Sequence, residues 1–297
     1  LIRNKMKKTF NFASTLTNST SYDGEQLESY ILKAFTKSKF VESLPAQNII
    51  QDIQFKKKVG RLDGSNLVQT GSTCAFNDSG TIVVSEKELY PLPYFINVQL
   101  CYEDLEAIYN SLNTGALNQE ELSASFSAAL TELMVSKMNA NMQAVYINKL
   151  DSLITTHALT GDTPSASTIV SIFSQMVQAI PEDVLENENL TFYMNKKTLQ
   201  LYYDYLATLA KLTPQDVMTP NYMGIKIVTI PTIATGKIYL LETGNIYIGV
   251  GALDEFSSMQ IIDMKPLGQG NNVRLILQGK GDLVVGWEEE AVKYTGS

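Results

Sequence analysis

The clearest pattern of apolar and polar positions in the chain lies between residues 119 and 149. Apolar side chains recur there every four residues, as expected for one face of a helix. They are Leu122, Phe126, Leu130, Met134, Met138, Met142 and Tyr146. Asn118 and Glu121 have the spacing of a capping box. The pattern predicts a helix about 45 Å long at 1.5 Å per residue. Its methionines could line an adaptable groove, but core packing is the interpretation that we favour.

The first 22 residues show no such periodicity. They contain no acidic residue, few large apolar groups and the cations Arg3, Lys5, Lys7 and Lys8. This composition is typical of an extended arm, whose cations could contact nucleic acid or a neighbouring subunit. Residues 25–40 have apolar positions at helical spacing, so we expect a short helix that packs on a partner or on the chain's own core.

Residues 51–88 have the pattern of two strands separated by a polar, glycine-rich middle. A hairpin of this length has too few large side chains to build a core, and isolated hairpins are marginal in water. It must therefore lie on another surface. Lys56, Lys57, Lys58 and Arg61 would suit an acidic surface on an adjacent molecule. Ordinary solvated lysines are the alternative.

The rest of the chain alternates between strand and helix patterns. We expect strands over 94–100, 190–194, 225–230, 237–241, 245–250 and 259–264, and helices over 103–112, 162–180 and 195–210. Residues 272–287 predict two strands joined by a turn at 279–282. This mixture indicates an α+β fold.

Composition narrows the function. The 297 residues are 44% hydrophobic and 18% charged, which is enough apolar material for a real core. The net charge of −8 argues against a protein that mainly coats nucleic acid. No uncharged stretch is apolar enough to span a membrane. The positive segment 1–8 is followed by the polar run 15–21 instead of the apolar region of a secretory signal. Cys74 and Cys101 have neither disulfide-framework nor zinc-site spacing.

Candidate chemistry is sparse. His157 is the single histidine and is expected at the end of a helix in a structural role. The glycines of 249–251 and 268–270 lack the spacing of nucleotide-binding loops and are interpreted as turns. The acidic run 288–290 could bind a divalent ion, but it more often forms a solvated face. We therefore expect no catalytic residue, cofactor or metal site, and a structural protein instead of an enzyme.

The order of these parts resembles the tailed-bacteriophage major capsid proteins of the Hong Kong ninety-seven type. The basic segment 1–22, the hairpin 51–88, the strand and helix of 95–106 and the long helix resemble that family's N-terminal arm, E-loop, peripheral domain and spine helix. The resemblance implies a Hong Kong ninety-seven type capsid fold. It covers essentially the whole chain.

The second half carries the same resemblance. Segments 191–195, 222–231 and 236–240 are similar to parts of the family's axial domain, and 288–291 to its return into the peripheral domain. The implied domains are an N-terminal arm (1–48), an E-loop (49–92), a peripheral domain with the spine helix (93–160), an axial domain (161–265) and a return hairpin (266–297).

The resemblance also implies a function. Such a chain assembles with itself into hexamers and pentamers of an icosahedral shell that encloses double-stranded DNA, with the E-loop of one subunit over its neighbour. A portal, a scaffold or prohead protease and a decoration protein are implied as further partners, without a membrane. The location is the virion, assembled in the bacterial cytoplasm, and a chain that begins at Leu1 is compatible with cleavage of a leading segment. An acidic or neutral inner wall would limit adsorption of the DNA.

The same sequence is also consistent with three other functions. An encapsulin, which resembles the same fold, would enclose a cargo enzyme instead of a genome. A soluble α+β enzyme or ligand-binding protein would be a stable monomer with a deep polar pocket. A tail or decoration protein would form rings, tubes or trimers.

Overall fold

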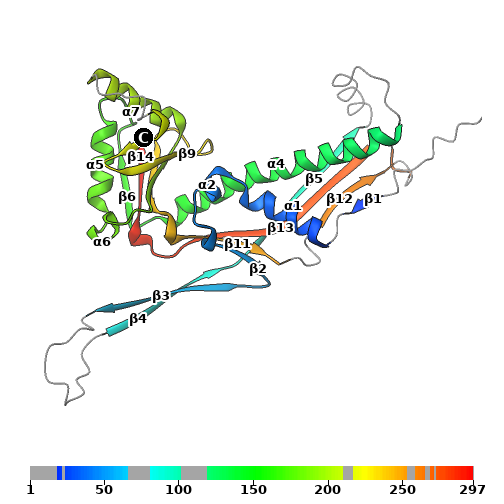
Figure 1. Cartoon of the computed structure of the whole chain (residues 1–297), viewed down its shortest axis with the longest axis horizontal. Helices are drawn as coiled ribbons and strands as arrows, with labels where there is room; N and C mark the ends of the chain where they lie inside the picture. The colour runs from blue at the N-terminus through cyan, green and yellow to red at the C-terminus, as the bar shows by residue number, and fades with distance from the viewer. Residues whose placement is uncertain are drawn as a thin grey trace, which may run out of the picture.

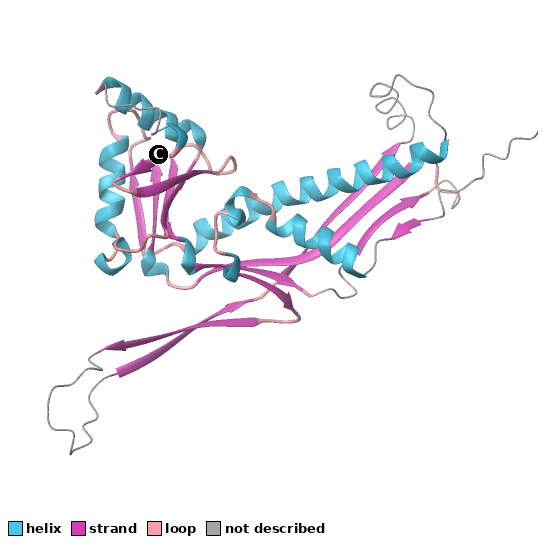
Figure 2. Cartoon of the chain, viewed as in Figure 1, coloured by secondary structure: helices cyan, strands magenta, loops and turns pink. Residues whose placement is uncertain are grey.

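The computed structural model describes residues 19–21, 24–65, 81–101, 119–209, 217–252, 258–264, 268–270 and 272–296. They form three parts (Figure 1). The elongated unit is a long sheet covered by helix α4 (Gln119–Leu153), and the compact unit is a second sheet flanked by helices. The projecting hairpin, β3 (Lys57–Ser65) and β4 (Thr81–Leu89), extends away from both (Figure 2).

The elongated unit is built on one six-stranded sheet. Its order is β1-β12-β13-β11-β2, with β5 on the other edge of β13, and only the β2–β11 pair is parallel. The strands are β1 (Ser19–Ser21), β2 (Ile49–Ile53), β5 (Leu92–Cys101), β11 (Ile246–Gly251), β12 (Ser258–Asp263) and β13 (Asn272–Val285). Helix α4 and α1 (Gly24–Thr36) lie over one face of this sheet, and α2 (Lys39–Glu42) follows α1.

Helix α4 confirms the main prediction from the apolar periodicity. It has 35 residues, which corresponds to about 52 Å, and it continues four residues beyond the predicted end. Met134, Met138, Met142, Tyr146 and Leu150 are each at most 3% exposed and form part of the main core. In this half of the helix the methionines therefore fill the core and do not line an open groove.

The prediction of a hairpin over 272–287 with a turn at 279–282 is wrong, because β13 is one continuous strand. It pairs with β5 over Asn272–Gly281 and with β11 over Gly281–Val285. The glycines that indicated a turn instead make room for the ring of Phe35. A Cβ would lie 2.7 Å from this ring at Gly279 and 2.5 Å from it at Gly281.

The two other glycine segments differ from each other. Residues 249–251 were expected to form a turn but lie in β11, where a Cβ on Gly249 would be 2.9 Å from Ile53. The expected turn at 268–270 is confirmed by positive φ angles of 71° at Gly268 and 91° at Gly270.

The compact unit contains the second six-stranded sheet, of order β6-β14-β10-β7-β9-β8. Its strands are β6 (His157–Gly161), β7 (Leu190–Met194), β8 (Asn221–Tyr222), β9 (Ile225–Thr229), β10 (Lys237–Glu242) and β14 (Ala291–Gly296), and its helices are α5 (Ile169–Ala179), α6 (Glu182–Leu185) and α7 (Lys196–Thr208). Phe173 and Phe192 join helix to sheet, with ring centroids 4.9 Å apart. The predicted cap of α7 is confirmed, since the Asn195 side chain accepts a hydrogen bond from the backbone N of Lys197.

The predictions around His157 need correction. This residue begins β6 and does not end a helix, because it pairs with Val292 of β14. The helix expected from residue 162 begins only at Ile169, since the chain must first turn out of β6. The Nδ1 atom of His157 is buried without a hydrogen-bond partner among the described residues.

The expected domain limits also differ from the observed sheets. The arm was expected to span 1–48, but residues 31–48 of this range pack on the chain's own body, where Phe35 and Phe40 are buried. Strands β11 and β12, expected in the axial domain, belong to the elongated sheet, and β14 belongs to the compact sheet. Strand pairing joins segments that are distant in sequence, so the order of the segments does not reveal sheet membership. No helix in the described ranges is long and apolar enough to cross a bilayer.

Asp151 connects the two units at the end of α4. Its carboxylate is 2.8 Å from Lys237 Nζ and accepts a hydrogen bond from the Tyr239 hydroxyl at 3.0 Å, both on β10. Burial would raise the pKa of Asp151, but these hydrogen bonds and the charges of Lys237 and Lys293 outweigh it and lower the pKa. The ionised carboxylate therefore stabilises the joint.

We expect Asp151→Ala to lower the free energy of unfolding by about 1.5 to 3 kcal/mol at pH 7, as for hydrogen bonds to a charged group. A lowered pKa means that this stabilisation is fully present above the ordinary value of 3.8 and is lost as the pH falls through the folded-state pKa. Urea unfolding of the unassembled chain at pH 7 and at pH 3 measures the difference. An equal loss at both values would show that the carboxylate charge is not the cause.

Candidate assembly site on the projecting hairpin

The projecting hairpin has two distinct faces. Its register runs from Lys57 opposite Leu89 to Ser65 opposite Thr81. Because side chains alternate between the faces of a strand, Val83, Ser85, Lys87 and Leu89 of β4 point to one side and Ile82, Val84, Glu86 and Glu88 to the other. We call these the body face and the outer face.

The body face attaches the base of the hairpin to the elongated unit. Val59 and Leu89 are buried against Ile53 and Val284. Further along, the indole Nε1 of Trp287 donates a hydrogen bond to Ser85 Oγ at 3.1 Å. The hairpin therefore leaves the body in a defined direction.

The outer face carries ion pairs near the base and aliphatic side chains toward the tip. Lys56 pairs with Glu88 at 2.8 Å, and Lys58 pairs with Glu86. Beyond them, Ile82 is 62% exposed and Val84 is 61% exposed. Clustered aliphatic exposure on a strand is typical of a surface that another molecule covers.

The predicted cluster of cations does not form one free basic patch. The hydrogen bond from Lys58 to Glu86 raises the pKa of Lys58, and the hydrogen bond from Lys56 lowers the pKa of Glu88. Lys57 is exposed and forms no ion pair within the described residues. Solvent-exposed pairs contribute little stability, so these lysines remain able to exchange partners. Their contact with a neighbouring subunit stays a prediction.

Arg61 points to the chain's own body. It forms an ion pair with Glu290, and its guanidinium lies 4.9 Å from the centre of the Trp287 ring. Glu290 is only 9% exposed, so the expectation that 288–290 form a solvated face is wrong for this residue. Burial and the charge of Glu290 together raise the pKa of the neighbouring Glu242. Arg61 therefore offsets negative charge at the junction of hairpin and body.

A second anchor lies where β4 turns into β5. The backbone N of Tyr90 donates to Asp282 Oδ2 at 2.8 Å, and the other oxygen of Asp282 pairs with Lys149 of α4. The Asp282 side chain is 4% exposed. One buried carboxylate thus joins the hairpin, the central strand β13 and the long helix.

Most residues that hold the hairpin were not predicted from the sequence. Glu86 and Glu88 could have been found, because pairing the strands antiparallel places them opposite the lysine cluster. Asp282, Trp287 and Glu290 lie about 200 residues further along the chain, and no local signal links them to the hairpin.

Several other predicted features cannot be placed. Arg3, Lys5, Lys7, Lys8 and Cys74 lie outside the described residues. Within the described part of the chain, no group of three or more His, Cys, Asp or Glu side chains could hold a metal ion, and Cys101 is a free thiol.

Comparison with known proteins gives matches in structure alone. No protein-family model matches the chain, and no curated protein matches its sequence. A virus-like particle from Pyrococcus furiosus is similar with a TM-score of 0.55 at 12% identity, covering 91% of this chain and 98% of that chain. A satellite phage P4 procapsid structure has a TM-score of 0.57 at 9% identity over 91% and 97%. A structure from Gordonia phage Cozz has a TM-score of 0.57 at 13% identity over 84% and 85%.

These likenesses cover nearly whole chains on both sides. At 9 to 13% identity they establish the fold. The predicted α+β fold of the Hong Kong ninety-seven capsid type is confirmed.

Proposed function

We propose that this protein is a major capsid protein. It would assemble with itself as hexamers and pentamers into an icosahedral shell around double-stranded DNA. The observation that carries the proposal is the outer face of the projecting hairpin. Ile82 and Val84 are exposed on a segment that extends beyond the body, and a second copy of the chain would supply the missing surface. Closed homo-oligomers form when such contacts repeat by symmetry.

The compact unit offers a second surface of the same kind. Met218 is 79% exposed and Met223 is 77% exposed, in the segments that flank β8. Contacts at both ends of an elongated subunit would let one chain touch several neighbours. Each obligate interface would bury roughly 2,000 Å² or more.

The direct test places a charge on the hairpin. We expect the wild-type chain to form uniform hollow polyhedral particles in negative-stain microscopy and Ile82→Lys/Val84→Lys to remain unassembled. The melting temperature of the unassembled chain should be unchanged, because both side chains are already mostly exposed.

The matched control is Ile82→Val/Val84→Ile, which keeps the outer face apolar at the same total volume. We expect this variant to form particles like the wild type. Particles from the lysine variant at wild-type yield would contradict the role of the outer face. A wild-type chain that stays monomeric across protein concentration, salt and pH would contradict the shell function.

The contents of purified particles test the finer assignment. Double-stranded DNA inside the particles supports a virion component made in a bacterial host, with a portal, a scaffold or prohead protease and a decoration protein as further partners. Particles that hold a protein cargo without nucleic acid would instead assign the chain to a cellular compartment.

A further inference from the structure

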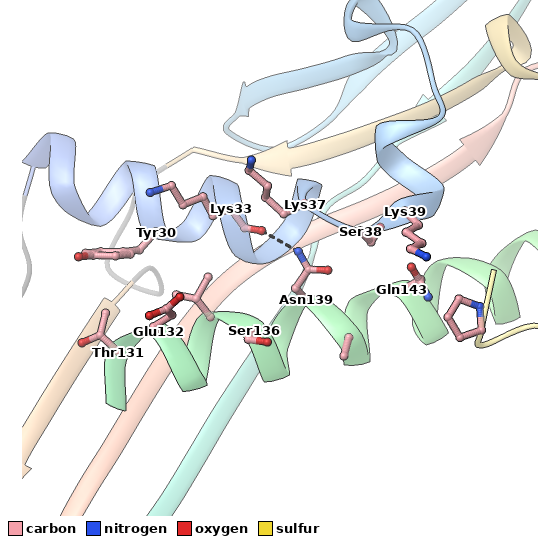
Figure 3. Close-up of a pocket in the computed structure, with 13 residues that line it drawn as sticks. Tyr30, Lys33, Lys37, Ser38, Lys39, Thr131, Glu132, Ser136, Asn139 and Gln143 are labelled. Carbon is pink, nitrogen blue, oxygen red and sulfur yellow. Dashed lines mark hydrogen bonds between the residues drawn. The ribbon is translucent and has the colours of Figure 1, made fainter. Parts of the chain in front are cut away.

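A groove with a basic rim lies between α1 and α4, on the helical side of the elongated unit. Its volume is about 710 Å³. Figure 3 shows Lys33 and Lys37 along one side, Lys39 at the start of α2, and the polar residues of α4 opposite them. The groove is remote from the projecting hairpin of its own subunit (Figure 1).

The three lysines are unneutralised. Lys33, Lys37 and Lys39 are exposed, and none forms an ion pair within the described ranges. By contrast, Lys149, Lys237 and Lys293 near the other end of α4 each lie within 4.0 Å of a carboxylate oxygen. Among the residues that the structure describes, Glu132 is the one acidic side chain that lines the groove. The groove is therefore locally positive on a chain whose net charge is −8.

Polar side chains of α4 lie on the floor of the groove. The side-chain amide of Asn139 donates to the backbone O of Lys33 at 3.0 Å, which ties the two helices together. The side-chain amide of Gln143 donates to Thr232 Oγ1 at 3.2 Å. Ser136 adds a hydroxyl one turn before Asn139. The bond from Asn139 holds the backbone of Lys33 at a fixed place on α4.

We propose that this groove binds the phosphate backbone of double-stranded DNA inside the shell, which differs from the acidic or neutral inner wall expected from the sequence. Lysine ammonium groups over a polar floor suit phosphates, and such binding is independent of base sequence. An acidic peptide is the alternative partner for such a rim, and the test below includes one. The chain's own first 22 residues are basic and would be repelled. The location inside the shell rests on the proposed function, whereas the binding of phosphates does not.

The test compares two triple variants of the full-length chain. Lys33→Gln/Lys37→Gln/Lys39→Gln removes the rim, and Lys196→Gln/Lys197→Gln/Lys226→Gln removes three exposed lysines of the compact unit. Binding to a short mixed-sequence duplex is measured by fluorescence anisotropy at several salt concentrations, at protein concentrations where sedimentation shows no particles.

Each phosphate contact contributes about 0.9 to the slope of log affinity against log salt. We expect the rim variant to reduce this slope by about 2.7 and the control variant to leave it unchanged. An unchanged slope in the rim variant, an equal reduction in both variants, or rim-dependent binding of polyglutamate in place of the duplex would overturn the proposal. Negative-stain microscopy of the wild-type chain and both variants tests shell formation separately. If the rim variant reduces the salt slope but the wild-type chain forms no particles, the shell function is contradicted and the phosphate-binding groove is not.

Discussion

Lys149→Met is expected to lower the free energy of unfolding by about 3 to 5 kcal/mol, because it leaves a buried carboxylate without its cation. The Asp282 side chain is 4% exposed, whereas Lys149 is 33% exposed. Removing the lysine therefore strands a charge that water cannot reach. Urea unfolding of the unassembled chain measures the effect.

The matched control is Lys137→Met on the same helix. Lys137 is exposed and has no ion pair within the described residues, so its loss should change the free energy of unfolding by no more than about 0.5 kcal/mol. Adding Asp282→Asn to Lys149→Met removes the stranded charge and should recover much of the stability. Equal effects of the two lysine substitutions would contradict the buried pair.

The same carboxylate should determine how firmly the hairpin is held. Asp282 accepts the hydrogen bond from the Tyr90 backbone N, at the turn between β4 and β5. We expect Asp282→Ala to speed hydrogen exchange at the Tyr90 amide.

Phe35→Ala should lower the free energy of unfolding by about 3 to 5 kcal/mol, as for other buried aromatic truncations. Phe35 is 1% exposed and lies over the glycines of β13. Gly281→Ala should cost about 1 to 3 kcal/mol, since its Cβ would overlap the ring. In the double variant the new methyl group occupies part of the space that the ring has left, so the loss should be smaller than the sum of the two.

Gly60→Ala is the control for a glycine within a strand. A Cβ there would meet its nearest atom, the backbone O of Ser85, at an ordinary 3.7 Å, so only a small change is expected. The free energies of unfolding of all four variants come from urea unfolding of the unassembled chains. Additive losses for Phe35→Ala and Gly281→Ala would mean that ring and glycine do not share one packing site.

Local pattern was sufficient for the elements that are long or well capped. The four-residue spacing of large apolar groups predicted α4, because only one face of a helix can meet the sheet. Asn195 marked the start of α7, since its side chain satisfies a free backbone N–H of the first turn. The projecting hairpin was likewise expected within residues 51–88 from its shortage of core side chains, although its first strand begins only at Lys57.

The local sequence pattern gave wrong predictions where contact with a distant segment determines a residue's conformation or burial. Gly279 and Gly281 have the composition of a turn, but Phe35 from a helix about 245 residues earlier needs that space. Glu290 looks solvated in its acidic run but is buried, and Arg61 from the distant hairpin pairs with it.

Amino-acid order alone was thus enough to define the succession of hairpin, long helix and mixed strands and helices, since periodicity and caps act within a few turns of chain. Three-dimensional packing was needed to assign strands to sheets, to bring Lys149, Asp282 and Tyr90 to one joint and to place three lysines around a groove. Those contacts depend on which surfaces exclude water together. That property belongs to the folded chain and not to any local stretch of residues.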